Sequence, residues 1–187
     1  MLIGITGETG SGKTTLANIL SNKYGYEVIH GDEVAHEVLT LEKFNEVLSW
    51  FELPPHDKVD RKYLGHLLFS IDDARKRYDA YIYPYIKERL DQIMRTSDNT
   101  NFVIDWNFLP KTSLKDECDI TILMKCGEYL RRERVKMRDN IDDDYFTKRN
   151  NACLKYCDED YDFVFVNESE YALEESIKKH LEGLLWK

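Results

Sequence analysis

The chain has 187 residues, of which 42% are hydrophobic, and this length and composition fit one domain with a core of its own. Lysine and arginine number 26 against 35 aspartate and glutamate, and the net charge of -9 opposes a broad nucleic-acid surface. We expect no signal peptide and no membrane span, and therefore a soluble cytoplasmic protein without membrane partners.

The first expected element is a strand at 1–6, which leads directly into "GETGSGKTT". This stretch fits the phosphate-loop pattern G-x-x-x-x-G-K-[ST] at Gly7, Gly12, Lys13 and Thr14, and it precedes a helical pattern, as the motif requires. Lys13 would bridge the β- and γ-phosphates of a nucleotide, and the Thr14 hydroxyl would bind Mg²⁺. We expect ATP or GTP to be bound by Gly7, Thr9, Gly10, Ser11, Gly12, Lys13, Thr14 and Thr15.

A second apolar run at 26–30 predicts a strand that ends just before Asp32. In doubly wound sheets ligands bind outside the carboxyl ends of the strands, so Asp32 could face the phosphate loop, orient an acceptor hydroxyl and take up its proton. An aspartate before "EVAHEV" is also a common helix N-cap without any chemical role. The residues alone leave both interpretations open.

The next connection is too long for one crossover helix, because it contains helical patterns near 32–50, 60–69 and 72–95. We interpret about 33–95 as a helical insertion over the acceptor side of the site, within a single domain that spans 1–187. Pro84 is expected to kink or split the last helix near Tyr83, because proline lacks an amide donor and clashes with the preceding turn.

A third strand is expected at 101–105, and it ends at Asp105, where a carboxylate that holds Mg²⁺ through water is expected. An aspartate at a strand end is also often a simple turn residue. Further apolar runs predict strands at 120–124 and 162–166. Strands that alternate with helices indicate an α/β, doubly wound, mainly parallel five-stranded sheet of the P-loop NTPase type, covered on both faces.

A basic cluster, "EYLRRERVKMRDN", follows the fourth expected strand in this acidic chain. Arg131, Arg134 and Arg138 are three and four residues apart, so they share one helical face. Such a face could close over a triphosphate, stabilise the charge of the transferring phosphoryl group and exclude water. A solvated surface helix is the alternative. We expect an arginine-rich lid at about 127–150.

The phosphate loop, "VIHGDEVAHEV", "DRKYLGHLLFSIDDARKRYDAYIYPYI", the arginine-rich lid and "YDFVFVNES" together resemble the dephospho-coenzyme A kinase family over most of the chain. Members of that family transfer the γ-phosphate of ATP to the ribose 3′-hydroxyl of dephospho-coenzyme A. The resemblance implies ATP and Mg²⁺ as ligands, Asp32 and Lys13 as catalytic residues, and Arg134 and Arg138 as catalytic lid arginines.

The same resemblance implies that Asn167 lies near the adenine of ATP and that Arg61 helps to hold the acceptor, beside Asp32 and Asp105. The chain departs from the family pattern at 107–111, where Asn107 replaces a proline, and at Tyr83, where the family has histidine. These departures fall in the acceptor half of the expected site, so the nucleotide half has the stronger support.

Two alternatives follow from these departures. One is a nucleoside or nucleotide kinase, including a viral one, that uses the same scaffold for a different small-molecule acceptor. The other is an ATP-binding regulatory protein without transfer activity, which the retained Lys13, Thr14 and Asp32 oppose. The sequence leaves the oligomeric state open.

Overall fold

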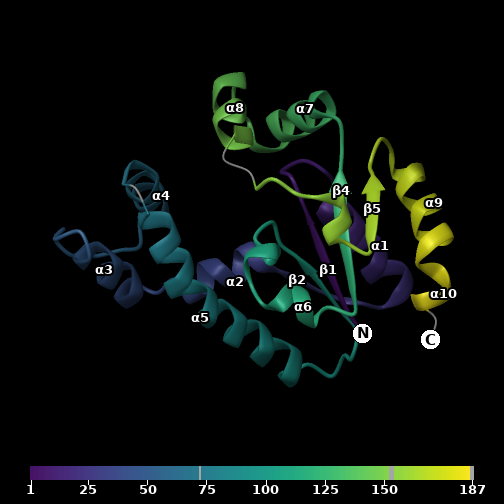
Figure 1. The fold of residues 1–187 in the computed structure, drawn as a ribbon, viewed down its shortest axis with the longest axis horizontal. Helices are drawn as coiled ribbons and strands as arrows, with labels where there is room; N and C mark the ends of the chain where they lie inside the picture. The colour runs from purple at the N-terminus through teal and green to yellow at the C-terminus, as the bar shows by residue number, and fades with distance from the viewer. Residues whose placement is uncertain (72, 152–153, 186–187) are drawn as a thin grey trace. The chain divides into compact units, whose positions relative to one another are not determined.

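The computed structural model describes the chain except for residues 72, 152–153 and 186–187. The chain separates into two compact units (Figure 1). The first unit comprises Met1–Gly31 and Ser97–Lys187 and contains the sheet. The second unit, Asp32–Thr96, is helical, and its bounds lie next to those of the insertion expected from the sequence.

A five-stranded parallel sheet in the order β2-β3-β1-β4-β5 forms the framework of the first unit. Its strands are β1 (Leu2–Gly7), β2 (Glu27–His30), β3 (Phe102–Asp105), β4 (Ile120–Lys125) and β5 (Phe163–Val166). The expected strands and the expected α/β fold class are therefore confirmed. β1 lies at the centre, and its Ile5 pairs in register with Asp105 of β3 on one side and with Ile122 of β4 on the other.

The helices of the first unit follow the strands in the alternating order that the sequence predicts. They are α1 (Lys13–Tyr24), the 3₁₀ turn η1 (Leu109–Lys111), α6 (Leu114–Glu117), α7 (Glu128–Asp139), α8 (Asp143–Asn151), the 3₁₀ turn η2 (Asp158–Asp160), α9 (Glu170–His180) and α10 (Glu182–Leu185). Among the described residues, no helix is long and apolar enough to span a membrane.

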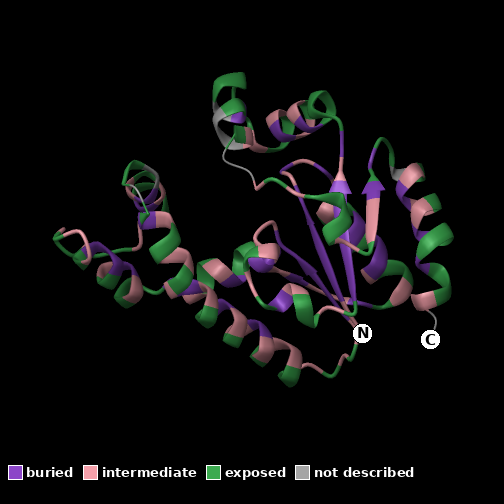
Figure 2. Ribbon diagram, in the orientation of Figure 1, coloured by how far each residue is buried: buried purple, intermediate pink, exposed green. Residues whose placement is uncertain are grey.

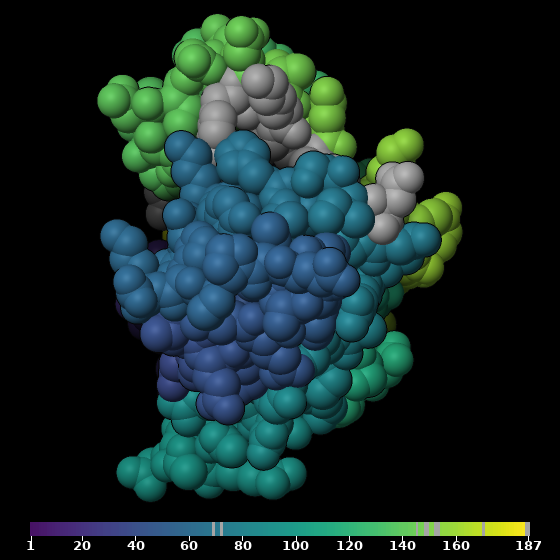
Figure 3. Space-filling model, turned by 90° about the vertical axis from the view of Figure 1, so that its left-hand side faces the viewer, coloured from purple at the N-terminus to yellow at the C-terminus, as the bar shows by residue number. Residues whose placement is uncertain are grey.

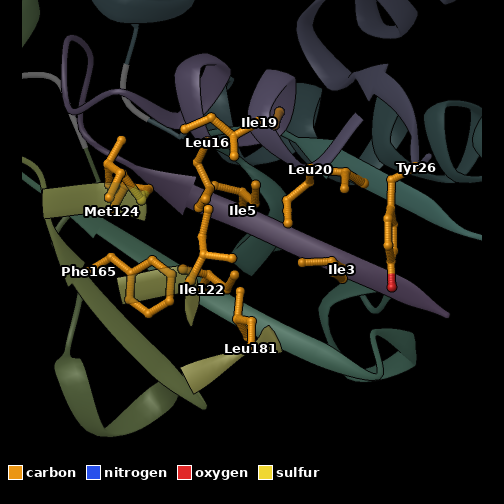
Figure 4. Close-up of a cluster of buried hydrophobic side chains, with 14 of the residues drawn as sticks. Ile3, Ile5, Leu16, Ile19, Leu20, Tyr26, Ile122, Met124, Phe165 and Leu181 are labelled. Carbon is orange, nitrogen blue, oxygen red and sulfur yellow. The ribbon is translucent and has the colours of Figure 1, made fainter. Parts of the chain in front are cut away.

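One face of the sheet packs against α1 and α9 through a cluster of apolar side chains (Figure 4). The cluster includes Ile3, Ile5, Leu16, Leu20, Ile122, Met124, Phe165, Leu173 and Ile177. Side chains alternate along a strand, so Gly4 faces the opposite side, where an added Cβ would lie 2.5 Å from Leu109 Cδ2. Both faces of the central strand are therefore covered, and Figure 2 shows the strands as mainly buried.

The described part of the second unit contains four helices, and its surface appears in blue and teal in Figure 3. They are α2 (Gly31–Val38), α3 (Leu41–Ser49), α4 (Arg61–Ser70) and α5 (Ala74–Thr96). The single helical pattern expected near 32–50 is in fact two helices, because α2 ends at Val38 and Thr40 caps α3 by accepting a hydrogen bond from the Lys43 amide at 3.3 Å. Asp60 caps α4 in the same way.

Pro84 was expected to kink or split the last helix near Tyr83, and the split was wrong, because α5 runs through Pro84 as one helix of 23 residues. A proline at this position removes the hydrogen bond to the Ala80 carbonyl, but Ala80 and Pro84 are both exposed, so water can satisfy that carbonyl. Ile82 and Ile86 on the opposite side of the helix are buried. Their burial offsets the cost of the proline, about 3 kcal/mol in a helix interior.

We expect Leu173→Ala to lower the free energy of unfolding by about 2–5 kcal/mol, since this side chain is fully buried in the cluster between the sheet, α1 and α9. Tyr171→Ala, on the same helix, truncates a side chain that is 71% exposed and should change the free energy of unfolding by no more than about 0.5 kcal/mol. Urea denaturation followed by circular dichroism measures both. Similar losses in the two variants would contradict the packing of α9 described above.

Candidate active site

The phosphate loop connects the end of β1 to the start of α1, and two hydrogen bonds of the Ser11 backbone help to fix its path. The Ser11 amide donates to the Glu8 carbonyl at 3.1 Å, which closes a turn within the loop. The side-chain amide of Asn167, just after β5, donates to the Ser11 carbonyl at 2.9 Å. Gly12 has φ 95°, and an added Cβ there would overlap that amide nitrogen, so only glycine fits.

The start of α1 provides the features of an anion site. Its N-cap residue is Gly12, which makes no side-chain cap hydrogen bond, and the N-terminus of a helix favours an anion. Lys13 reaches across the loop, and its Nζ donates to the Glu8 carbonyl at 3.3 Å. The fully buried Ser11 Oγ has no hydrogen-bond partner among the described residues. These groups fit the phosphates of a nucleotide.

A hydroxyl and a carboxylate meet beside the loop. The Thr14 hydroxyl donates to Asp105 Oδ2 at 2.6 Å, and Asp105 is 8% exposed at the end of β3. His30 Nδ1, at the end of the adjacent β2, lies 3.4 Å from the same oxygen. The described residues contain no cluster of three or more His, Cys, Asp or Glu that could hold a metal alone. Thr14 and Asp105 fit Mg²⁺, which usually keeps several of its waters.

Of the three lid arginines expected to share one face, Arg131 contacts the loop and Arg134 contacts Asn167, the residue that holds the loop at Ser11. Arg131 is 3% exposed and contacts Glu8 and Thr9. Arg134 Nη1 lies 3.5 Å from the Asn167 carbonyl, which places it beside the same segment. Arg138, by contrast, is paired with its neighbour Asp139 through Nε at 2.6 Å, and this hydrogen bond raises the pKa of the guanidinium. The arginines thus differ in their contacts although they share one face.

Tyr156 is a site residue that the sequence did not reveal. Its hydroxyl lies 3.1 Å from the Asn107 carbonyl and 3.4 Å from the Gly7 carbonyl. The Thr6 hydroxyl donates to the same Asn107 carbonyl at 3.2 Å. These bonds tie the segment after β3 to the end of β1. No signal in the sequence could have identified a lone tyrosine that follows the lid.

Two predicted site residues, Asp32 and Arg61, belong to the second unit. Asp32 is exposed in the first turn of α2, where its negative charge complements the helix dipole. Arg61 opens α4, and its Nη2 donates to the His36 carbonyl of α2 at 3.1 Å. These contacts join α4 to α2 within the unit. The other predicted residues, including Asp105, Arg134 and Asn167, lie in the first unit.

The second unit also contains a polar cluster on α5. Arg75 Nε donates to Asp79 at 2.7 Å, one helical turn away. Burial raises the pKa of Tyr78 to about 12, and burial followed by the negative charge of Asp79 raises the pKa of Tyr83. Tyrosine is ordinarily protonated at neutral pH, and the raised pKa values reinforce this state, so both phenols keep a hydrogen. The i, i+4 spacing of Arg75 and Asp79 is the signal that could have indicated this pair.

Comparison with known proteins identifies the family. The family model for dephospho-CoA kinase matches residues 1–171. A dephospho-CoA kinase of Borreliella burgdorferi is 29% identical over 201 residues, which cover 99% of this chain and 95% of the relative. Two solved structures share the fold. A Thermus thermophilus protein has a TM-score of 0.81 and 24% identity, with 98% of this chain and 97% of that chain covered. A dephospho-CoA kinase from Campylobacter jejuni has a TM-score of 0.65 and 22% identity, with 97% and 98% covered.

Because the family model spans most of the sequence and includes the phosphate loop, Asp105 and the arginines of α7, the chain belongs to the dephospho-CoA kinase family.

Proposed function

We propose that this protein is a cytoplasmic enzyme that transfers the γ-phosphate of ATP to the ribose 3′-hydroxyl of dephospho-CoA, which gives coenzyme A and ADP. The observation that carries the proposal is the family match over residues 1–171. The geometry of the first unit supports it, because the phosphate loop, the Thr14–Asp105 pair and Arg134 lie around one edge of the sheet.

The first unit would bind the nucleotide. The loop at 7–14 and the N-terminus of α1 would hold the phosphates, and Lys13 would exchange its bond to the Glu8 carbonyl for the β- and γ-phosphate oxygens. Thr14 and Asp105 would hold Mg²⁺, partly through water, and the bound ion would neutralise charge on the phosphates. Asn167 holds the loop at Ser11 and follows β5, so we place it beside the bound ATP.

Asp32 would accept the proton of the attacking hydroxyl. Its position is limited by the chain itself, since it follows His30 by two residues and an extended chain spans at most about 7 Å over that distance. His30 pairs in register with Asp105 at the carboxyl edge of the sheet. This connection keeps Asp32 near the edge where the Thr14–Asp105 pair lies.

Arginines would stabilise the negative charges of both substrates. Arg61 and Arg75 of the second unit would bind the phosphates of dephospho-CoA, because guanidinium groups donate in the planar geometry that phosphate accepts. Arg134 and Arg138 would stabilise the charge on the transferring phosphoryl group. Arg138 would have to leave Asp139 to do so.

Product analysis tests the proposed reaction. The purified protein with Mg·ATP and dephospho-CoA should release ADP and yield a product one phosphate heavier, with the new phosphate on the 3′-oxygen, as mass spectrometry and phosphorus NMR would record. A parallel panel of nucleosides and nucleoside monophosphates is the control. Turnover with a panel member and none with dephospho-CoA would contradict the proposal.

Lys13→Ala should abolish transfer, because the variant lacks the cation that clamps the β- and γ-phosphates. Lys23→Ala is the matched control: it removes the same charge from the other end of α1, where Lys23 pairs with Glu174 on the surface. The measurement is ADP release at saturating dephospho-CoA. A Lys13→Ala variant with wild-type turnover would refute the assignment of the nucleotide site.

Asp32→Asn should reduce kcat by about a hundredfold or more and leave the affinity for ATP nearly unchanged, because the amide keeps the shape of the carboxylate but cannot take a proton. Glu33→Gln, the adjacent exposed acid in the first turn of α2, should retain wild-type kcat. Steady-state kinetics and ATP titration separate the two effects. Unchanged turnover in Asp32→Asn would leave this residue with a helix-terminal role only.

A further inference from the structure

We infer that Arg131 is a positioning residue that braces the phosphate loop against α7, and that it acts on the nucleotide through the loop. The sequence places Arg131 on the same helical face as Arg134 and Arg138. In the structure it is 3% exposed, whereas the side chain of Arg138 is 58% exposed. A buried guanidinium requires a complete set of partners, and these partners define its role.

The partners of Arg131 occupy most of its donors. Nε donates to the Cys126 carbonyl at 3.3 Å. Nη1 donates both to the Thr9 carbonyl at 3.3 Å and to Asn150 Oδ1 at 2.8 Å. Nη2 lies 3.2 Å from Glu8 Oε2, which supplies the opposite charge. Since Nε has one hydrogen and Nη1 has two, a phosphate could accept from either nitrogen only by displacing these partners.

Two of these partners, Glu8 and Thr9, belong to the phosphate loop itself. The backbone of α7 adds a third contact, because Gly10 packs so closely that an added Cβ would lie 2.9 Å from the Arg131 carbonyl oxygen and 2.8 Å from Val135 Cγ2. Consecutive loop residues are therefore held from the side of α7. Asn167 holds the following part of the loop at Ser11.

The other two partners connect the loop to the rest of the lid. Cys126 follows β4, and Asn150 lies in the last turn of α8. One buried side chain therefore joins the loop, the β4–α7 connection and α8. Removing a single member of a buried charged network leaves its partners unsatisfied, so the loop would lose its fixed path when Arg131 is truncated.

This role predicts a specific effect on nucleotide affinity. The phosphate loop would hold the β- and γ-phosphates, and AMP has neither of them. A loosened loop should therefore weaken the binding of ADP more than the binding of AMP. A general loss of folded protein lowers the active fraction and leaves the ratio of the two affinities unchanged. The ratio of the ADP to the AMP dissociation constant therefore separates positioning from a merely structural role.

The experiment compares Arg131→Met with Arg132→Met by isothermal titration with ADP and with AMP, in Mg²⁺ buffer without an acceptor. Arg132 is the matched control because it is the next residue of α7 and pairs with Glu128 and Asp143, away from the loop. We expect Arg131→Met to raise the dissociation constant of ADP by about tenfold or more and that of AMP by much less, as the loss of charge-assisted hydrogen bonds implies. Arg132→Met should keep both affinities. The KM for ATP should rise in the same proportion as the ADP dissociation constant.

Arg131→Lys keeps the charge beside Glu8 but cannot serve the separate carbonyl and amide acceptors, so we expect an intermediate loss of ADP affinity. If Arg131→Met does not fold, the ADP and AMP affinities of Arg131→Lys test the positioning role. A folded variant that binds ADP and AMP equally more weakly, or that binds both as the wild type does, leaves the ratio of the two dissociation constants unchanged. Either result would overturn the inference. Failure of both variants to fold would make Arg131 a folding residue and would overturn it as well.

The inference rests on the proposed use of ATP but is independent of the acceptor. Wild-type turnover with dephospho-CoA tests the proposed function, whereas the ADP to AMP ratio of the variants tests the role of Arg131. If the wild type phosphorylates another acceptor and the Arg131 variants still lose ADP affinity selectively, only the proposed function is contradicted. If the wild type phosphorylates dephospho-CoA and the Arg131 variants keep the wild-type ratio of the two dissociation constants, only the inference is contradicted.

Discussion

Parallel pairing of β1 with β3 and β4 is the constraint on which the nucleotide site depends. All strands of a parallel sheet end at the same edge, so the loop after β1, Asp105 at the end of β3 and the connection after β4 come together there. The register sets the details, because Ile5 lies opposite Asp105 and Gly7 lies opposite Met124. A slip of β3 by one residue would turn Asp105 to the other face of the sheet and away from Thr14.

The same constraint explains which parts of the fold could be predicted. Strands buried on both faces require continuous apolar runs, and those runs identified every strand of the sheet to within one residue. The helical insertion was harder, because the pattern at 32–50 does not show that Thr40 begins a new helix. The course of α5 through Pro84 depends on the exposure of Ala80, which the sequence does not reveal.

The arginines of α7 show a similar limit on what the sequence can predict about the site. The spacing of Arg131, Arg134 and Arg138 predicts one shared face, but a shared face does not place its residues at the same distance from a ligand. A helix rises about 1.5 Å per residue, so Arg131 and Arg138 are roughly 10 Å apart along the axis. The N-terminal end of α7 adjoins the loop, which is why Arg131 is buried against Thr9 while Arg138 pairs with Asp139. Tertiary placement of the helix decides these roles.

Under the proposed function, the division of the chain into two units has a consequence for how substrate choice can change. Only two backbone connections join the units, and one of them carries Asp32 within two residues of the sheet edge. The carboxylate that would accept the proton is therefore tied to the nucleotide unit by chain connectivity, whatever the rest of the second unit contains. Residues deeper in that unit, such as Arg75 and Tyr83, can differ between relatives without moving this carboxylate. Under the proposed function, departures from the family pattern in the second unit would therefore change acceptor affinity and leave the transfer chemistry in place.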